Sequence, residues 1–462
     1  MPRLSLARKY RSTFFIFPAF LPLVELLPWF LTLLGAAAGG SQLLSKALWQ
    51  RNGLRILLGV MSIGLFTAAG GLVWQRYGHQ PAVAVGSELA AELPRFESFT
   101  TQLGRPLPTT VLTPLTELWS VKTVDHNLSK PLVRDGRLFV GTLENTLTAY
   151  GTSDGRPLWT LHKTESVFTP PATAGDRMFI GEGYHTSPVC ALTALTYPEG
   201  KPLWSRRFRS HLESYPALDL SNNRLWQSGG GTGLWALAAD TGEKLWWQPL
   251  GHMDVPPLYT DGRLFVIARL SEEADGTALF ELKPETGAIQ WQTPLTGNTM
   301  GSIFRSGDTL IVTTAIGQVG EVKGSDAGWA NAVTLDGKLL WSTKLSAMPL
   351  PEGALARDGK LFFTTLKEGS LVALRTADGA VQWQEKIGPV IQTDVTLIED
   401  AAAPLVVGVA NDGTVSLRDA ATGKERAKLQ VEAGDSTPLY ADGVLYITTP
   451  NTIRAFAGFG GR

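Results

Sequence analysis

Short apolar runs separated by turn signals recur along most of the chain. Five runs of the type Leu-Phe-Val follow a glycine paired with an aspartate, at Asp135, Gly175, Asp261, Asp358 and Asp442. Asp-Gly predicts a tight turn, because glycine adopts a positive φ without steric cost. The apolar run that follows predicts a strand buried between neighbouring sheets. Looser copies bring the count to about eight units.

A tryptophan closes most of these units at a fixed position. The phrase Gly-x-x-x-Trp occurs six times and ends at Trp159, Trp204, Trp246, Trp291, Trp341 and Trp383. The spacing of roughly 42 to 50 residues is the period of a four-stranded propeller blade. Each indole buries a large apolar area and needs an acceptor for its N–H, so we expect it to fasten one blade to the next.

The two ends of the repeat region complement each other. The last unit, residues 445–456, has no Gly-x-x-x-Trp after it, whereas Trp119 precedes the first full unit. A strand around Trp119 that completes the last blade closes the count at eight, with Ala427 in the one slot without a tryptophan. Sharing a blade in this way protects sheet edges. We therefore predict an all-β, eight-bladed β-propeller of four-stranded antiparallel blades over residues 114–462.

The N-terminal part differs in composition from the repeats. Residues 54–74 carry no charge after Arg55, and residues 14–39 are also apolar but contain three prolines and Glu25. About 20 apolar residues are enough to cross a bilayer as a helix. We predict an α-helical membrane anchor over residues 1–80, followed by a linker over 81–113 in which Glu88–Glu97 forms a short helix. A cleaved signal peptide is the competing interpretation of the N-terminus.

The orientation of this anchor depends on the first segment. Positive residues cluster before it and again between the two segments. If residues 14–39 re-enter the membrane, both clusters lie in the cytoplasm and the propeller lies outside. If both segments span, the larger N-terminal cluster favours a cytoplasmic propeller.

Charge and composition exclude several classes of function. The formal net charge is −1, so the chain has no basic footprint for nucleic acid. The single cysteine, Cys190, lies in an apolar stretch and is expected to be a small buried residue. Motifs of common hydrolases are absent. Five histidines show no ligand spacing and are expected to be ordinary polar residues, so we predict no catalytic, metal or cofactor site: His126, His162, His185, His211 and His252.

The repeat resembles that of the pyrroloquinoline-quinone-type (quinoprotein-like) β-propellers. Residues 236–246, Ala-Leu-Ala-Ala-Asp-Thr-Gly-Glu-Lys-Leu-Trp, are similar to the tryptophan-docking motif of that family, and the resemblance covers residues 116–458. Within it, the short blades and Ala427 in the penultimate blade are most similar to the BamB-like propellers of outer-membrane-protein assembly. The resemblance implies a non-catalytic scaffold that binds partner proteins through loops on one face. The apolar N-terminus, in place of a lipoprotein cysteine, implies the bacterial inner membrane, with the propeller on the periplasmic side.

The predicted function is therefore a membrane-anchored scaffold for protein–protein interaction, or an assembly subunit, whose partners are the membrane and other subunits of a membrane complex. The candidate contact loops are residues 270–276 and 315–330, and Trp329 is a possible partner contact. One alternative is a sensor module that binds a small ligand. Another is a quinone-cofactor dehydrogenase, which needs an aspartate base and a calcium site of six to eight oxygen ligands.

Overall fold

The computed structural model describes residues 89–90, 93–99, 115–127, 129–184, 187–271, 276–316, 327–366, 368–389, 395–399, 401 and 403–458. They belong to the unit Gly86–Arg462, which we describe by itself. The predicted anchor over residues 1–80, with its segments 14–39 and 54–74, lies outside the described residues. Within the described ranges, no helix has both the length and the apolar character that crossing a membrane requires.

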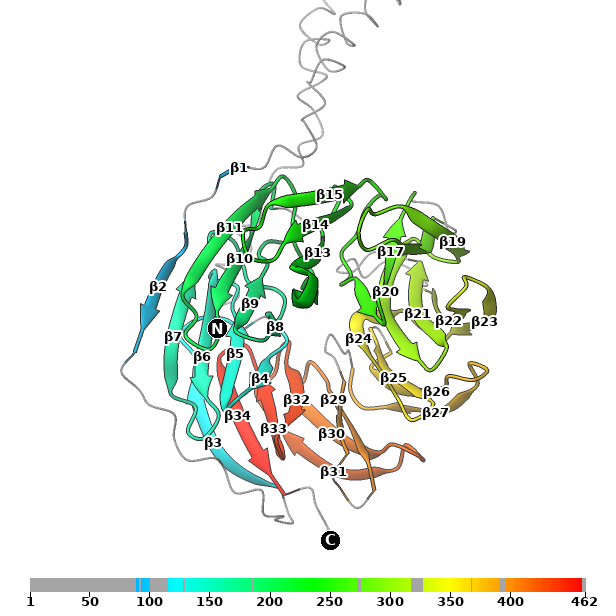
Figure 1. The fold of residues 1–462 in the computed structure, drawn as a ribbon. Helices are drawn as coiled ribbons and strands as arrows, with labels where there is room; N and C mark the ends of the chain where they lie inside the picture. The colour runs from blue at the N-terminus through cyan, green and yellow to red at the C-terminus, as the bar shows by residue number, and fades with distance from the viewer. Residues whose placement is uncertain are drawn as a thin grey trace, which may run out of the picture. The chain divides into compact units, whose positions relative to one another are not determined.

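Eight antiparallel sheets follow one another around a ring, which confirms the all-β, eight-bladed propeller (Figure 1). Blade 1 contains β4 (Leu132–Arg134), β5 (Arg137–Gly141), β6 (Thr146–Gly151) and β7 (Pro157–His162). Blade 2 contains β8 (Ala172–Ala174), β9 (Arg177–Ile180), β10 (Cys190–Thr196) and β11 (Pro202–Phe208). Blade 3 contains β12 (Ala217–Asp219), β13 (Arg224–Ser228), β14 (Leu234–Ala238) and β15 (Lys244–Gln248), with the 3-10 turn η2 (Leu220–Asn222). Blade 4 contains β16 (Leu258–Thr260), β17 (Arg263–Arg269), β18 (Thr277–Leu282) and β19 (Ile289–Leu295).

The remaining blades repeat this order. Blade 5 contains β20 (Thr299–Ser306), β21 (Thr309–Ile316), β22 (Ala327–Thr334) and β23 (Leu339–Leu345). Blade 6 contains β24 (Pro349–Arg357), β25 (Lys360–Thr365), β26 (Ser370–Arg375) and β27 (Val381–Lys386). Blade 7 contains β28 (Thr396–Ile398), β29 (Leu405–Val409), β30 (Thr414–Asp419) and β31 (Glu425–Gln430). Blade 8 contains β32 (Thr437–Ala441), β33 (Val444–Thr448), β34 (Thr452–Ala457) and, from the other end of the repeat region, β3 (Thr116–Lys122).

The ring closes as the sequence predicts. Strand β3 pairs with β34, so that Trp119 lies opposite Ala455. The Asp-Gly pairs form the turns between the first and second strands of their blades. Asp135 and Gly136 have φ values of 48° and 71°, and positive φ at both central residues is the signature of a type I′ hairpin turn. The turn chemistry thus sets the first hairpin of the five blades that carry the pair.

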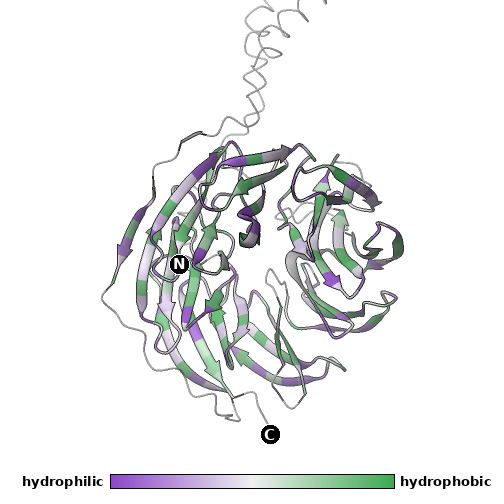
Figure 2. Ribbon diagram, viewed as in Figure 1, coloured by the Kyte–Doolittle hydropathy of each residue, from purple (hydrophilic) through white to green (hydrophobic). Residues whose placement is uncertain are grey.

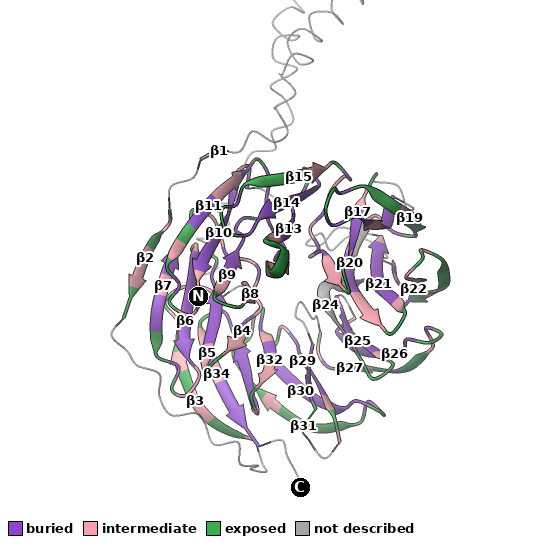
Figure 3. Ribbon diagram, in the orientation of Figure 1, coloured by how far each residue is buried: buried purple, intermediate pink, exposed green. Residues whose placement is uncertain are grey.

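Burial within a blade follows from its neighbours. The middle strands have a packed sheet on each side, and all residues of β6 and β14 are buried. Along the outer strands, exposed polar residues alternate with less exposed apolar ones. Figures 2 and 3 show this for β31, whose sequence is ERAKLQ. Continuous apolar runs therefore mark middle strands, and alternating runs mark the circumference of the ring.

Seven tryptophans join neighbouring blades through the same pair of contacts. In each case the indole N–H donates to a backbone carbonyl in the turn between the last two strands of the next blade. Trp119 donates to Thr152 at 2.8 Å, Trp159 to Pro198 at 3.1 Å, Trp204 to Ala239 at 3.0 Å, Trp246 to Pro284 at 2.9 Å, Trp291 to Leu335 at 3.0 Å, Trp341 to Thr376 at 3.1 Å and Trp383 to Ala420 at 3.3 Å. The glycine of that turn packs directly against the indole of the preceding blade: a Cβ built on Gly242 would lie 2.7 Å from Trp204 Cε3.

The interface between blades 7 and 8, which we call the seam, has no such contact among the residues that the structure describes. Here the slot holds Ala427, and the next blade offers no turn to receive an indole, because its last two strands come from opposite ends of the repeat region. Ala427 and Leu115 instead pack against the core cluster that contains Phe456. The alanine is therefore a consequence of where the ring is closed.

Two short strands before β3 extend neighbouring blades. Strand β1 (Leu89–Ala90) pairs with β11, and β2 (Arg95–Ser98) pairs with β7. The expected helix over Glu88–Glu97 is therefore wrong. Phe96 packs against Trp159 with ring centroids 5.8 Å apart, and this contact with an exposed sheet edge outweighs the local helix preference. Both strands fall inside the range predicted as a linker, whose limits stay a prediction.

We predict that two matched glycine variants will differ in free energy of unfolding by the contribution of the glycine–indole contact. Gly262→Ala places a Cβ at φ +74° with no heavy atom within 4 Å, so it should lower the free energy of unfolding by about 1–2 kcal/mol through backbone strain alone. Gly242→Ala carries the same strain at φ +70° and also meets the Trp204 ring, so it should cost a further ~1–3 kcal/mol from overpacking. Denaturant unfolding of the full-length variants measures the difference. Equal costs would show that the indole contact contributes nothing.

Candidate functional site

The two faces of the ring carry different kinds of connection. The Asp-Gly turns and the tryptophan-receiving turns lie at one end of the antiparallel strands, which we call the turn face. The connections between second and third strands, and the crossings from one blade to the next, lie at the other end, the loop face. Loops positioned by a rigid scaffold are common sites of binding. The polar clusters described next, apart from the seam cleft, all lie on this loop face.

A buried ion pair ties blade 1 to blade 2. Lys163 follows β7 and Glu182 follows β9, and each side chain is only 1% exposed. Lys163 Nζ lies 3.5 Å from Glu182 Oε2 and donates to Thr193 Oγ1 at 2.6 Å and to the Ala191 carbonyl at 3.3 Å. Burial lowers the pKa of the Lys163 ammonium, and the Glu182 carboxylate opposes this shift.

The carboxylate of Glu182 has more partners than the ammonium. Its Oε1 accepts from Thr164 Oγ1 at 2.7 Å and from the Ala191 backbone N–H at 2.8 Å. Its Oε2 accepts from the backbone N–H groups of Thr164 at 3.1 Å and Glu165 at 3.4 Å. The pair is thus fully built into the crossing between the blades, which makes it a structural tie and keeps it out of contact with solvent.

A second cluster brings two histidines and an aspartate together. His211 lies in the crossing from blade 2 to blade 3, and His252 and Asp254 lie in the crossing from blade 3 to blade 4. Asp254 Oδ1 is 2.9 Å from His211 Nε2, and Asp254 Oδ2 is 2.5 Å from His252 Nε2. The two imidazole centroids are 5.2 Å apart. Burial favours a raised pKa for Asp254, but the hydrogen bonds with both imidazoles outweigh it and hold that pKa below its usual range.

The sequence shows no ligand spacing among the histidines and does not predict that His211 and His252 lie together in this cluster. No spacing rule for a single loop finds it, because the two histidines are separated by one whole blade. The available signal is positional: His211 follows Trp204 by seven residues (211 − 204) and His252 follows Trp246 by six (252 − 246). Equivalent places in consecutive blades meet in space, so a repeat alignment predicts the pairing where a linear motif does not.

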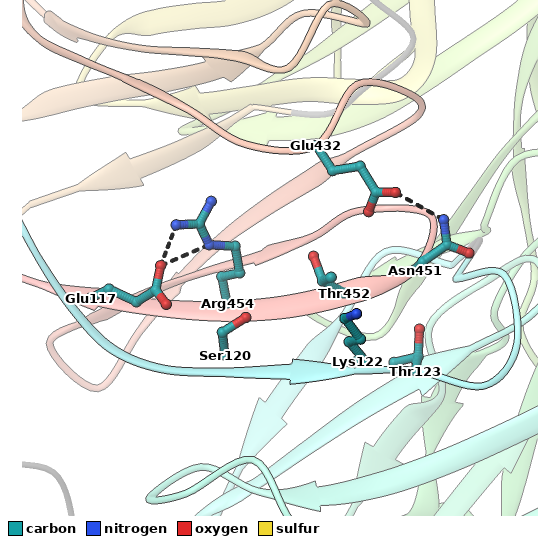
Figure 4. Close-up of a pocket in the computed structure, with 8 residues that line it drawn as sticks. All are labelled: Glu117, Ser120, Lys122, Thr123, Glu432, Asn451, Thr452 and Arg454. Carbon is teal, nitrogen blue, oxygen red and sulfur yellow. Dashed lines mark hydrogen bonds and ion pairs between the residues drawn. The ribbon is translucent and has the colours of Figure 1, made fainter.

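A polar cleft of about 510 Å³ opens at the seam (Figure 4). Its lining carries charges of both signs, because Arg454 on β34 pairs with Glu117 on β3, at 2.8 Å from Nε to Oε2, and Lys122 lies beside them. At the other end, Glu432 accepts from Asn451 Nδ2 at 2.9 Å. That hydrogen bond is the largest of several effects that lower the pKa of Glu432. The cleft lies at the one blade interface without an indole.

Apolar side chains also reach solvent on the loop face over blades 8, 1 and 2. We define the apolar loop patch as Val124, Leu143, Phe168 and Tyr184. Val124 is fully exposed, and Leu143 and Tyr184 are 37% and 41% exposed. The Phe168 and Tyr184 rings contact each other with centroids 5.5 Å apart and planes tilted by 52°. The Leu143 backbone N–H donates to the His126 carbonyl at 2.9 Å, which holds two of the loops together.

The structure places the predicted site residues in two settings. The seven blade tryptophans lie between sheets towards the turn face, away from the loop face. Trp329 lies in β22, opposite Thr314 and Lys344, and the expectation that it belongs to a long loop is wrong, because the strands on both sides extend further than the polar and glycine-rich composition indicates. Its role as a partner contact stays a prediction.

These observations define a β-propeller of the pyrroloquinoline-quinone-type class. A family model described as "Outer membrane protein assembly factor BamB" matches residues 110–210, 187–277 and 232–458, so the matches together span 110–458. The chain belongs to this family. No curated protein matches the chain in sequence.

Solved structures are similar to this chain at low sequence identity, and the first two below share its fold. The computationally designed protein Ika8 is 14% identical, with a TM-score of 0.59 over 74% of this chain and 99% of that one. The quinohemoprotein alcohol dehydrogenase from Comamonas testosteroni is 13% identical, with a TM-score of 0.55 over 75% and 77%. BamB from Moraxella catarrhalis is 13% identical, with a TM-score of 0.40 over 79% and 99%.

We predict an asymmetric response when the buried ion pair is broken. Glu182→Gln should lower the free energy of unfolding by about 3–5 kcal/mol, because it leaves Lys163 unpaired and removes a carboxylate from several donors. Lys163→Met should cost less, because the carboxylate keeps its hydrogen bonds. Thermal and urea unfolding of the full-length variants measure both costs. A Lys163→Met variant less stable than Glu182→Gln contradicts this account of the site.

Proposed function

We propose that the chain is a non-catalytic, membrane-anchored scaffold for protein–protein interaction, an assembly subunit of a membrane complex. The observation that carries the proposal is the family match over residues 110–458, since the family is described by an assembly role. The geometry supports it, because rigid blades hold the loops in fixed positions. The docking surface is therefore already ordered in the free protein, and less conformational entropy is lost on binding. The dehydrogenase from Comamonas testosteroni is similar in fold only, and at 13% identity no activity follows for this chain.

The apolar loop patch is the surface best suited to a partner. Exposed apolar residues that gather on one face mark interaction sites more often than scattered ones do. The Phe168–Tyr184 pair, whose rings are in contact, offers aromatic area of the kind that dominates binding energy. Val124 and Leu143 extend this area towards blade 8. The expected partner is a folded protein with an apolar patch of its own and a polar rim.

The anchor completes the proposal. The apolar segments 14–39 and 54–74 support attachment to the bacterial inner membrane, and a periplasmic propeller agrees with the family's assembly role at the outer membrane. On this account the anchor restricts the propeller to the membrane surface, where its partners are other subunits of a membrane complex.

Substitution within the apolar loop patch should remove the partner. In gentle detergent, the wild-type chain should co-purify with at least one protein in a fixed ratio. Val124→Asp combined with Leu143→Asp should reduce the recovered partner at least about tenfold, equivalent to about 1.4 kcal/mol. Leu245→Asp is the matched control, because Leu245 is 48% exposed but lies on the outer strand β15. Equal recovery with both variants would place the docking surface elsewhere.

Reporter fusions after Arg462 should locate the propeller. If the propeller is periplasmic, alkaline phosphatase fused there is active in intact cells, because its disulfides form only in an oxidising compartment. A fluorescent reporter that matures only in the cytoplasm should stay dark at the same position. The opposite pair of results would place the propeller in the cytoplasm and would fit two full membrane spans.

A further inference from the structure

We propose that His211, His252 and Asp254 form a binding site for a divalent transition-metal cation of the zinc type. One ligand atom from each residue lies within 4.8 Å of the other two. Both imidazoles direct the same nitrogen, Nε2, at the two oxygens of one carboxylate. Three donors that converge from two separate blade crossings are the arrangement that a metal requires and that no single loop supplies. The proposal is independent of any partner protein.

The donor set fits zinc. Two imidazole nitrogens and a carboxylate oxygen are common zinc ligands, and a three-residue site keeps its fourth position for water or another group. Ligand atoms about 2 Å from a tetrahedral zinc lie roughly 3.3 Å from one another. The present separations of 2.9 Å and 2.5 Å between histidine nitrogens and carboxylate oxygens are shorter than that value, because the three side chains now hydrogen-bond to one another. To bind the ion, the carboxylate must give up these hydrogen bonds and move away from the two imidazoles.

The backbone around the cluster is fixed in advance. The Met253 N–H donates to the Gly230 carbonyl at 2.9 Å, and the Gly230 N–H donates to the Met253 carbonyl at 3.1 Å. His252 and Arg269 exchange a similar pair of bonds at 3.0 Å and 2.9 Å. The backbone of His252 and Met253 is thereby held against Arg269 of blade 4 and Gly230 of blade 3. A preorganised loop loses little entropy when it binds an ion.

Close packing leaves no room for a side chain at Gly230. A Cβ there would lie 2.7 Å from His211 Nε2, and the residue has φ +51°. His211 is buried, whereas the His252 and Asp254 side chains are each 23% exposed. The site is thus closed on the His211 side and open on the other, which gives an ion a path of entry and leaves a coordination position towards solvent. Bound metal would join blades 2, 3 and 4 at the loop face.

Metal titration of the untagged, chelator-treated full-length chain tests the site. The wild type should bind one Zn²⁺ per chain by calorimetry, and Co²⁺ in its place should show the intense visible absorption of a four-coordinate ion. His252→Gln and Asp254→Asn should each weaken binding at least about tenfold, since each removes one of three protein ligands. His126→Gln, on the same face but outside the cluster, should bind as the wild type does.

A second measurement needs no variant. Zinc should protect His252 from modification by diethyl pyrocarbonate in the wild-type chain, as measured by mass spectrometry of its peptides, while His126 stays reactive. The proposal is overturned if the wild type binds no stoichiometric Zn²⁺ or Co²⁺, if both ligand variants bind as tightly as His126→Gln, or if zinc leaves His252 unprotected. In those cases the three residues form only a hydrogen-bonded tie between blade crossings.

Discussion

The contact between an indole and a glycine turn of the next blade is the interaction on which the rest of the ring depends. Each Gly-x-x-x-Trp phrase takes part twice: its glycine receives the preceding tryptophan, and its tryptophan reaches the following blade. Gly242 and Trp246 show both functions within five residues. A sheet that is held on both sides in this way has little freedom to tilt, so a local sequence rule sets the relative position of neighbouring blades at seven of the eight interfaces.

At the seam, the Gly-x-x-x-Trp phrase has no tryptophan, and blades 7 and 8 are not joined by an indole contact in the described part of the chain. Closure by β3 joins the two ends of the repeat region, but it also leaves blade 8 without a turn that could receive an indole from blade 7. The position that would carry this indole holds Ala427. The cleft lined by Glu117 and Arg454 opens there, and the ion pair between them links β3 to β34 across the closure. Between blades 7 and 8, polar contacts take the place of the indole: Asn451 Nδ2 donates to Glu432 at 2.9 Å, and Arg454 donates to the Gln430 carbonyl at 3.3 Å.

The repeat made the fold predictable, and departures from the repeat did not follow from the sequence. The period, the Asp-Gly turns and the return of Trp119 to the last blade all rest on local patterns that recur. Strand β2 forms only because the free edge of β7 and the Trp159 ring receive Phe96, which no local preference encodes. The histidine cluster was missed for a similar reason: its members share equivalent positions in consecutive blades and no linear motif.

The separation of the two faces explains where function can reside. The tryptophan contacts hold the blades together towards the turn face, so exposed residues at the loop face can change without removing a blade-to-blade indole contact. The loop ends are held instead by individual polar ties, such as Lys163 with Glu182. Asn127 provides another, since its Nδ2 donates to the Thr449 carbonyl at 2.8 Å between blades 1 and 8. Because each tie is specific to its own crossing, the loop face can differ from blade to blade, whereas the turn face must repeat. The proposed partner surface and the proposed ion site both lie on the loop face, where the sequence is free to differ between blades.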